Sequence, residues 1–198
     1  MTWIKTVPAD KAKGTLKKLY ERIKGPDGNI DNIMLAHSLR AHTMQGHMAL
    51  YKNVLHHSGN KIDEWFLEAL GVHVSMLNNC NYCVDHHFEG MRRLLDDNFH
   101  ATAIKIAFDS GAPASMFKPK ECSALSYAGK LTETPDQMAE SDVDQLRDDG
   151  WDDGEILEIN QVVAYFNYAN RMVLGLGITT DGDVLGTSPD KGSSWGHR

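Results

Sequence analysis

Residues 64–95 constrain the fold more than any other stretch, because two expected helices meet there at a strong break. Asn78-Asn79 forms the break, since asparagine favours helix caps and turns. The helix before it is predicted to fold back against the helix after it. Glu68 lies ten residues before Asn78, and His87 lies eight residues after Asn79. At about 1.5 Å per residue, an antiparallel hairpin brings these two side chains within about one turn of each other.

The same stretch concentrates reactive side chains at helical spacing. Cys80, Cys83 and His87 occupy positions i, i+3 and i+7, which places them within about 60° of arc on a helix. His86 is expected to point elsewhere. Together with Glu68, the three residues form a line of carboxylate, imidazole, thiol and thiol. These four are the candidate catalytic residues.

Composition limits the class of protein. The 198 residues are 41% hydrophobic with a mean hydropathy of -0.40, values typical of a soluble globular protein. No apolar run approaches the roughly 18 residues that span a bilayer, and the N-terminus lacks the apolar segment of a secretory signal. A net charge of -7 without a long Lys/Arg run argues against nucleic-acid binding. We therefore expect a cytoplasmic protein that binds neither membranes nor nucleic acid.

The remainder of the chain is predicted to be helical as well, since no alternating strand pattern occurs. One helical region is expected over residues 31–57, with a break near Leu39, and a long helix over 152–174. We predict an all-α fold with a single domain over residues 1–180. The polar tail over 181–198 is expected to be poorly ordered or packed on a neighbouring subunit.

A weak internal similarity suggests a degenerate two-fold repeat. At an offset of ninety residues, three positions match, namely Leu67, Glu68 and Val72 with Leu157, Glu158 and Val162. Chance similarity between two amphipathic helices is the alternative interpretation, because the chemistry is not repeated. Asn170 stands where Cys80 would recur.

Other polar residues are assigned ordinary structural positions. Asn170 is expected to make a polar contact between helices. Five histidines do not share a helical face and are predicted to be surface or core residues, namely His37, His42, His47, His56 and His57.

The cysteine pair fits reversible thiol oxidation. Cys83, in the first turn of its helix, is expected to have a lowered thiol pKa because of the helix dipole and His87. A thiolate attacks the O–O bond of a hydroperoxide and becomes a sulfenic acid, which Cys80 can condense into a disulfide. An imidazole backed by a carboxylate can pass a proton to the departing oxygen. His87 and Glu68 would supply that relay.

Two other functions fit the same pair. A CxxC pair in a reducing compartment is typical of metal-binding as well as catalytic sites. A structural zinc site would need a fourth ligand, for which only His86, Cys122 or a distant histidine is available. A non-enzymatic redox sensor or stress-response protein would use the disulfide to change its surface.

The order of residues in LEALGVHVSMLNNCNYCVDHH resembles the signature of the alkylhydroperoxidase D and carboxymuconolactone decarboxylase superfamily, specifically its uncharacterised peroxidase-related branch. The similarity extends over about residues 10–180. It implies an all-helical fold, assembly as a trimer or hexamer, and thiol-dependent peroxidase activity. No cofactor and no metal is expected.

The resemblance also implies roles for individual residues. The family's second cysteine attacks peroxide and the first resolves it, which corresponds to Cys83 and Cys80. The relay carboxylate and histidine correspond to Glu68 and His87. Tyr82 departs from the pattern, because some peroxidatic members have a histidine there, so no proton-transfer role is assigned to it. A small hydroperoxide substrate and a dithiol or lipoyl-type reductant are the expected partners.

Overall fold

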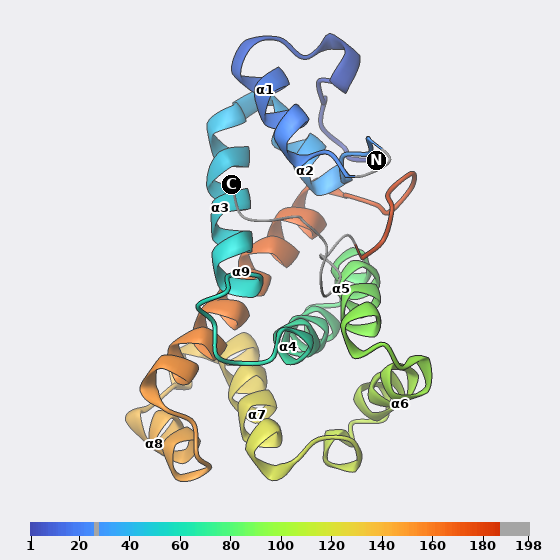
Figure 1. Cartoon of the computed structure of the whole chain (residues 1–198). Helices are drawn as coiled ribbons and strands as arrows, with labels where there is room; N and C mark the ends of the chain where they lie inside the picture. Colours follow the sequence, from blue (N-terminus) through green and yellow to red (C-terminus); the bar gives the residue numbers. More distant parts are fainter. Residues whose placement is uncertain (26–27, 187–198) are drawn as a thin grey trace.

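The computed structural model describes residues 1–25 and 28–186, and the regular structure of this part is entirely helical (Figure 1). In chain order, the α-helices are α1 (Gly14–Ile23), α2 (Asn32–Ala36), α3 (Ala41–Leu55), α4 (Glu64–Leu77), α5 (Asn81–Leu95), α6 (Asn98–Asp109), α7 (Pro119–Glu133), α8 (Glu140–Asp148) and α9 (Asp153–Leu176). Short 3-10 helices lie at Ala9–Lys11, Ser38–Arg40, Pro113–Ser115 and Pro135–Gln137. The all-α class predicted from the sequence is confirmed. None of the described helices combines the length and apolar character needed to cross a membrane.

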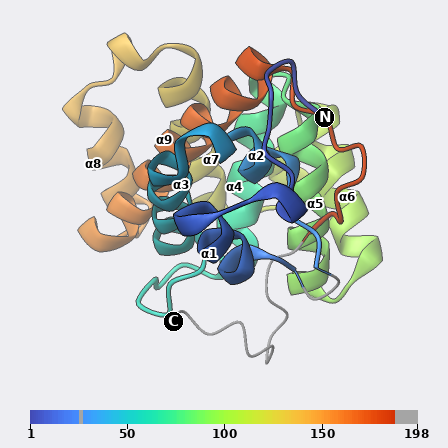
Figure 2. The ribbon, with the colours of Figure 1, turned by 90° about the horizontal axis from the view of Figure 1, so that it is seen from above.

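Helix α4 forms the centre of the fold. It packs against α5, α7 and α9, and both views show it between α9 and α5 (Figures 1 and 2). Its sequence explains this position, because apolar residues surround the helix instead of forming one stripe. Phe66, Leu67, Leu70 and Val74 are at most 2% exposed. Glu68 is buried among them, so its carboxylate lies in the interior of the protein.

The turn between α4 and α5 lies at the predicted break, which is confirmed. Helix α4 ends at Leu77, Asn78 is its C-cap residue, and Asn79 adopts the left-handed conformation with a φ of 56°. Asparagine tolerates this conformation better than most residues, since its short polar side chain can hydrogen-bond locally. The chain then reverses, and α5 packs along α4.

A smaller hydrophobic cluster joins the N-terminal helices. Tyr20 of α1 packs with Met34 of α2 and Met44 of α3. The predicted break near Leu39 is confirmed, since a 3-10 turn separates α2 from α3. Helices α2 and α3 both pack against α9, and residues of all three line the cavity described below.

The N-terminus lies beside the end of α9. Backbone hydrogen bonds join residues 1–3 to residues 176–179. After α9 the chain continues over α2 and α5, so residues 181–186 of the predicted tail contact their own chain. The rest of that tail, 187–198, lies outside the described residues.

The two halves of the suggested repeat occupy different environments. Leu67 is fully buried, whereas Leu157 is 56% exposed. Glu68 lies in the interior, whereas Glu158 accepts hydrogen bonds at about 3.0 Å from two backbone N–H groups just before α4. Glu158 thus joins α9 to the backbone that leads into α4. The duplication stays a hypothesis.

Gly71 allows α4 and α9 to approach closely, and its replacement by alanine is expected to destabilise the fold. A Cβ atom at this position would lie 2.1 Å from the Phe166 ring, which in turn contacts His87 with ring centroids 4.5 Å apart. Overpacking costs about 1–3 kcal/mol, and the gain in helix propensity is at most about 1 kcal/mol. We expect the Tm of Gly71→Ala to fall by several degrees when thermal unfolding is followed by circular dichroism.

Gly46→Ala in α3 is the matched control, because no atom outside the local backbone lies within 4 Å of its Cβ position. This substitution should raise the free energy of unfolding by about 0.5–1 kcal/mol. A Gly71→Ala protein as stable as the wild type would show that α9 can move away from α4 at little cost.

Candidate active site

Helix α5 begins at the cysteine pair. Cys80 is the N-cap residue and Cys83 lies in the first turn, and both are free thiols. They are buried, with exposed fractions of 0% for Cys80 and 2% for Cys83. Ala36, Val173 and Ile178 pack with them, so the pair lies where α2, α5 and the end of α9 meet.

The two thiols have opposite pKa shifts because they are hydrogen-bonded to each other. This hydrogen bond, donated by Cys83, lowers the pKa of the Cys80 thiol. The same bond, together with burial, raises the pKa of the Cys83 thiol well above its usual value. The lowered pKa that the sequence predicted for Cys83 is therefore wrong, since donation to Cys80 and loss of hydration outweigh the helix dipole. A base is needed to take the proton from Cys83.

Glu68 and His87 are in direct contact across the hairpin, as the break at the turn predicted. Glu68 Oε2 accepts a hydrogen bond from His87 Nδ1 at 2.6 Å, and the Glu68 side chain is fully buried. A carboxylate only accepts, so it fixes the tautomer with the proton on Nδ1 and the lone pair on Nε2. The edge-on contact with Phe166 also restrains the imidazole ring. His87 is thereby prepared to act as a base.

A cavity of about 120 Å³ adjoins both Cys83 and His87. Its walls come from α1, α2, α3, α5, α9 and the loop before α2, and include the apolar and aromatic side chains of Ile33, Met34, Met48, Tyr51, Tyr82 and Tyr165. The described lining residues include Cys83 but not Cys80, so a molecule in the cavity meets Cys83 first. In residues 1–25 and 28–186, no group of three or more His, Cys, Asp or Glu side chains is arranged to hold a metal ion.

Solved structures with a similar fold extend over almost the whole chain. An uncharacterized peroxidase-related protein from Silicibacter sp. TM1040 has a TM-score of 0.76 at 22% sequence identity, over 90% of this chain and 91% of that one. The alkylhydroperoxidase AhpD core of an uncharacterized peroxidase-related protein from Ralstonia eutropha JMP134 has a TM-score of 0.78 at 19% identity, over 96% and 98%. The chain has the alkylhydroperoxidase D fold. The fold implied by the sequence resemblance is confirmed.

The AhpD-like fold also occurs in a protein named for a different reaction. The debrominase Bmp8 has a TM-score of 0.69 at 17% identity, over 90% of each chain. A cysteine-to-alanine variant of that debrominase has been solved in complex with 2,3,4-tribromopyrrole. No protein-family model and no curated protein matches the sequence of the present chain. The fold alone therefore does not assign a reaction to this chain.

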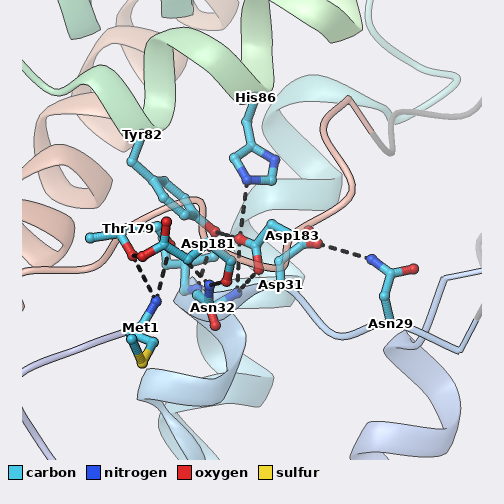
Figure 3. Close-up of polar contacts among 10 residues, drawn as sticks. Met1, Asn29, Asp31, Asn32, Tyr82, His86, Thr179, Asp181 and Asp183 are labelled. Atoms are coloured by element: carbon cyan, nitrogen blue, oxygen red, sulfur yellow. Dashed lines mark hydrogen bonds and ion pairs between the residues drawn. The ribbon is translucent and has the colours of Figure 1, made fainter.

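In this AhpD-like chain, a segment that follows α9 holds the residues beside Cys83. Asp183 accepts a hydrogen bond from the Tyr82 hydroxyl at 2.8 Å and lies 3.2 Å from His86 Nε2 (Figure 3). It also accepts hydrogen bonds from the Asn32 backbone N–H at 3.0 and 3.1 Å. The prediction that His86 points elsewhere is wrong, because His86 and Tyr82 both line the cavity of Cys83. Tyr82 serves here as a donor to Asp183.

Replacing Asp183 with asparagine is expected to loosen this segment. The Asp183 carboxylate is 2% exposed and accepts every hydrogen bond just described, whereas an asparagine amide would turn its NH₂ group either toward the Asn32 N–H or toward Tyr82 and His86. Leaving buried donors unpaired costs about 1–3 kcal/mol. We expect a lower Tm and faster proteolytic cleavage after α9.

Asp181→Asn is the control for that change, because Asp181 is exposed and its carboxylate bonds only the neighbouring Thr179 hydroxyl among the described contacts. It should alter stability by less than about 0.5 kcal/mol. Equal cleavage rates for the two variants would contradict the anchoring role of Asp183.

The sequence missed a contact between Asn170 and the thiols. Its Nδ2 donates to Ser75 Oγ at 3.0 Å and its Oδ1 accepts from Asn78 at 2.9 Å, which confirms the predicted contact between helices. Its amide also hydrogen-bonds Cys80 and Cys83. These bonds to Asn170 lower the pKa of each thiol. Their effect is weaker than those of the thiol–thiol bond and of burial. The ninety-residue similarity placed Asn170 opposite Cys80 but gave no reason to expect contact.

Two histidines that the sequence assigned to ordinary positions also line the cavity. His56 Nδ1 bonds Glu64, and its Nε2 lies 3.9 Å from Glu68 Oε1. His47 is buried, and burial, with smaller effects of His37 and His87, lowers its pKa to about 3. His47 is therefore neutral at physiological pH. No local pattern could reveal either residue, because both reach the site only through tertiary packing.

Proposed function

We propose that this chain is a thiol-dependent peroxidase that reduces hydrogen peroxide or a small alkyl hydroperoxide. The observation that carries the proposal is the cavity shared by Cys83 and His87, with Glu68 bonded behind the imidazole. The names of two fold neighbours, which are called peroxidase-related, agree with it. The reaction needs a reactive sulfur and a proton donor beside one bound peroxide, and the presence of Cys83 and His87 in the lining of one cavity supports this assignment.

In the first step, His87 Nε2 takes the proton of the Cys83 thiol, because the raised pKa of this thiol leaves little free thiolate. The sulfur attacks the terminal peroxide oxygen. An S–O bond forms, the O–O bond breaks, and the sulfur supplies the two electrons. The imidazolium, stabilised by Glu68, gives its proton to the departing oxygen. The products are a sulfenic acid at Cys83 and an alcohol or water.

In the second step, Cys80 resolves the sulfenic acid. Its sulfur attacks Cys83, an S–S bond forms, the S–O bond breaks, and hydroxide leaves as water with the proton of Cys80. A dithiol or lipoyl-type reductant then exchanges with the disulfide and regenerates both thiols while it becomes oxidised. Because Cys83 lines the cavity and Cys80 does not, the reductant is expected to attack the Cys83 sulfur.

The cavity limits the class of peroxide. A volume of about 120 Å³ accommodates a small molecule, and much of the lining is apolar or aromatic. Apolar walls favour a substrate with an organic group, because burial of apolar surface contributes to binding. Hydrogen peroxide has no apolar group and gains no such contribution. A small alkyl or aryl hydroperoxide is the preferred substrate.

One observation favours a second candidate reaction, the reductive removal of bromide from an aromatic ring. Cys83 shares its cavity with the rings of Tyr51, Tyr82 and Tyr165, which suit a planar ligand, and the debrominase Bmp8 has the same fold. In that reaction the dithiol would supply two electrons. A C–H bond would replace the C–Br bond, bromide and a proton would be released, and the disulfide would form.

The test is peroxide consumption by the purified chain with several electron donors. We expect turnover of tert-butyl hydroperoxide with dihydrolipoamide or another dithiol, and one intramolecular disulfide when no donor is present. Failure to form any disulfide on peroxide titration would contradict both the peroxidase and the redox sensor. Disulfide formation without turnover would favour the sensor, and bromide release from 2,3,4-tribromopyrrole would favour the second reaction. Stoichiometric zinc that is lost in Cys80→Ser would favour a structural zinc site.

A further inference from the structure

Tyr165 and His47 form a second polar pair on the cavity wall, and the proton relay uses neither of them. Tyr165 belongs to α9 and His47 to α3, so they come from different helices than Cys83 and His87. Both line the cavity, and both are almost fully buried, with exposed fractions of 4% and 5%. A buried hydroxyl beside a reactive thiol requires an explanation, since apolar side chains would fill the same space without a polar group to satisfy.

The pair is joined by one long hydrogen bond. The Tyr165 hydroxyl lies 3.5 Å from His47 Nε2, and the ring centroids are 5.7 Å apart. In the described part of the chain, His47 is the only hydrogen-bond partner of that hydroxyl. His47 Nδ1 is buried there without a partner. Among the described residues, His47 therefore makes a hydrogen bond through Nε2 and none through Nδ1.

The unengaged nitrogen indicates which group donates. If Tyr165 donated to Nε2, the neutral imidazole would carry its proton on Nδ1, and a buried N–H would lack an acceptor. Buried donors without partners are rarer than under-satisfied acceptors. The favoured tautomer of His47 therefore has its proton on Nε2, which donates to the Tyr165 oxygen. The Tyr165 O–H is then free to donate into the cavity.

The phenol of Tyr165 lines the same cavity as Cys83 and His87. Burial raises its pKa well above the usual value, and smaller increases come from the charges of Tyr51, Cys83 and Glu68. Tyr165 therefore stays protonated and remains a donor. His47 stays neutral because of its burial, so it does not place a positive charge on the wall of the cavity.

We propose that Tyr165 is a further catalytic residue, a hydrogen-bond donor to the peroxide oxygens during attack by Cys83, and that His47 is the positioning residue that turns its O–H into the cavity. This inference rests on the peroxidase function proposed above. His87 transfers the proton to the departing oxygen, whereas Tyr165 keeps its proton and holds the peroxide in place. Donors fixed in a buried site stabilise the charge that develops on oxygen without having to reorient.

The experiment measures oxidation of Cys83 in a single turnover. In a Cys80→Ser background, the protein is mixed with tert-butyl hydroperoxide, and the sulfenic acid is trapped with dimedone and quantified by mass spectrometry. We expect Tyr165→Phe to lower the second-order rate constant about tenfold to a hundredfold. Tyr168→Phe is the matched control on the same helix, because Tyr168 is not among the described cavity-lining residues. It should leave the rate within about twofold.

Alkylation of Cys83 by iodoacetamide separates a catalytic role from a structural one. This reaction has no departing oxygen, so Tyr165→Phe should change its rate by less than about threefold if the phenol acts on peroxide. A parallel fall in both rates would show that the substitution merely distorts the site, and the proposal would be overturned.

Variants of His47 test the positioning role. His47→Leu removes the donor to Tyr165 and should reproduce most of the loss seen in Tyr165→Phe. His47→Gln places an amide N–H near the position of Nε2 and should restore much of the oxidation rate. If neither His47 variant lowered the oxidation rate of Cys83, His47 would be removed from the proposal. An unchanged oxidation rate in Tyr165→Phe would overturn the proposal while the peroxidase function stands, whereas the absence of any Cys83 oxidation in the Cys80→Ser protein would overturn both.

Discussion

Cys83→Ser is expected to lower peroxide turnover about a thousandfold or more, because it removes the atom that attacks the O–O bond. Cys80→Ser should behave differently. Its Cys83 can still reduce one equivalent of peroxide, but the reaction should stop at the sulfenic acid because no resolving thiol is present. The measurement is peroxide consumed per chain with and without a dithiol, combined with mass spectrometry of the oxidised cysteine.

Cys122→Ser is the matched control for these variants. Cys122 lies on α7, outside the described lining of the cavity, so both turnover and disulfide formation should be retained. If Cys80→Ser consumed no peroxide while Cys83→Ser consumed one equivalent, the roles of the two cysteines would be reversed. Turnover that survives Cys83→Ser would remove Cys83 from the mechanism.

Local sequence signals were sufficient to predict the hairpin and the contact between Glu68 and His87. The break at Asn78-Asn79 depends on residues that are adjacent in sequence, and the helical rise then fixes which side chains meet across the turn. The break between α2 and α3 was also predicted, near Leu39. The hairpin prediction depends on backbone preferences that act over a few residues.

The raised pKa of the Cys83 thiol was not predicted, because its first cause is a hydrogen bond to Cys80, which depends on side-chain orientation, and its second is burial by distant parts of the chain. The sequence places Cys83 at the start of a helix, which favours the thiolate. The structure covers that start with Ala36 of α2 and Val173 of α9 and bonds the two thiols together. The hydrogen bond to Cys80 and desolvation together outweigh a helix dipole whose effect is usually below about 1 kcal/mol.

The sequence also did not predict that Tyr165 and His47 meet, or that Asp183 contacts Tyr82. Tyr165 and His47 are 118 residues apart, and Asp183 is 101 residues from Tyr82. No periodic pattern marks such pairs, because each residue fits the apolar or polar face of its own segment. The fold and the four candidate residues were therefore accessible from the sequence, whereas their surroundings required the structure.

Glu68→Gln is expected to slow oxidation of Cys83 roughly a hundredfold, which is typical for the loss of general acid–base support. The glutamine carbonyl can still accept the hydrogen bond from His87 Nδ1, so the imidazole keeps its orientation. What is lost is the negative charge that stabilises the imidazolium formed when His87 takes the proton of Cys83. The substitution preserves shape and removes a buried charge, so the Tm is not expected to fall.

Glu158→Gln is the control for the loss of a carboxylate, because Glu158 occupies the corresponding position in the ninety-residue similarity and bonds backbone N–H groups before α4. Its oxidation kinetics should match those of the wild type.

Rates are measured by single-turnover oxidation in the Cys80→Ser background, so that reduction of the disulfide does not limit them. If Glu68→Gln oxidised at the wild-type rate, His87 would not need the carboxylate, and the buried charge of Glu68 would require a different explanation. Alkylation by iodoacetamide then shows which step is slowed in Glu68→Gln. If the alkylation rate falls in parallel with the oxidation rate, the deprotonation of Cys83 is impaired. If alkylation is normal, the protonation of the departing oxygen is impaired.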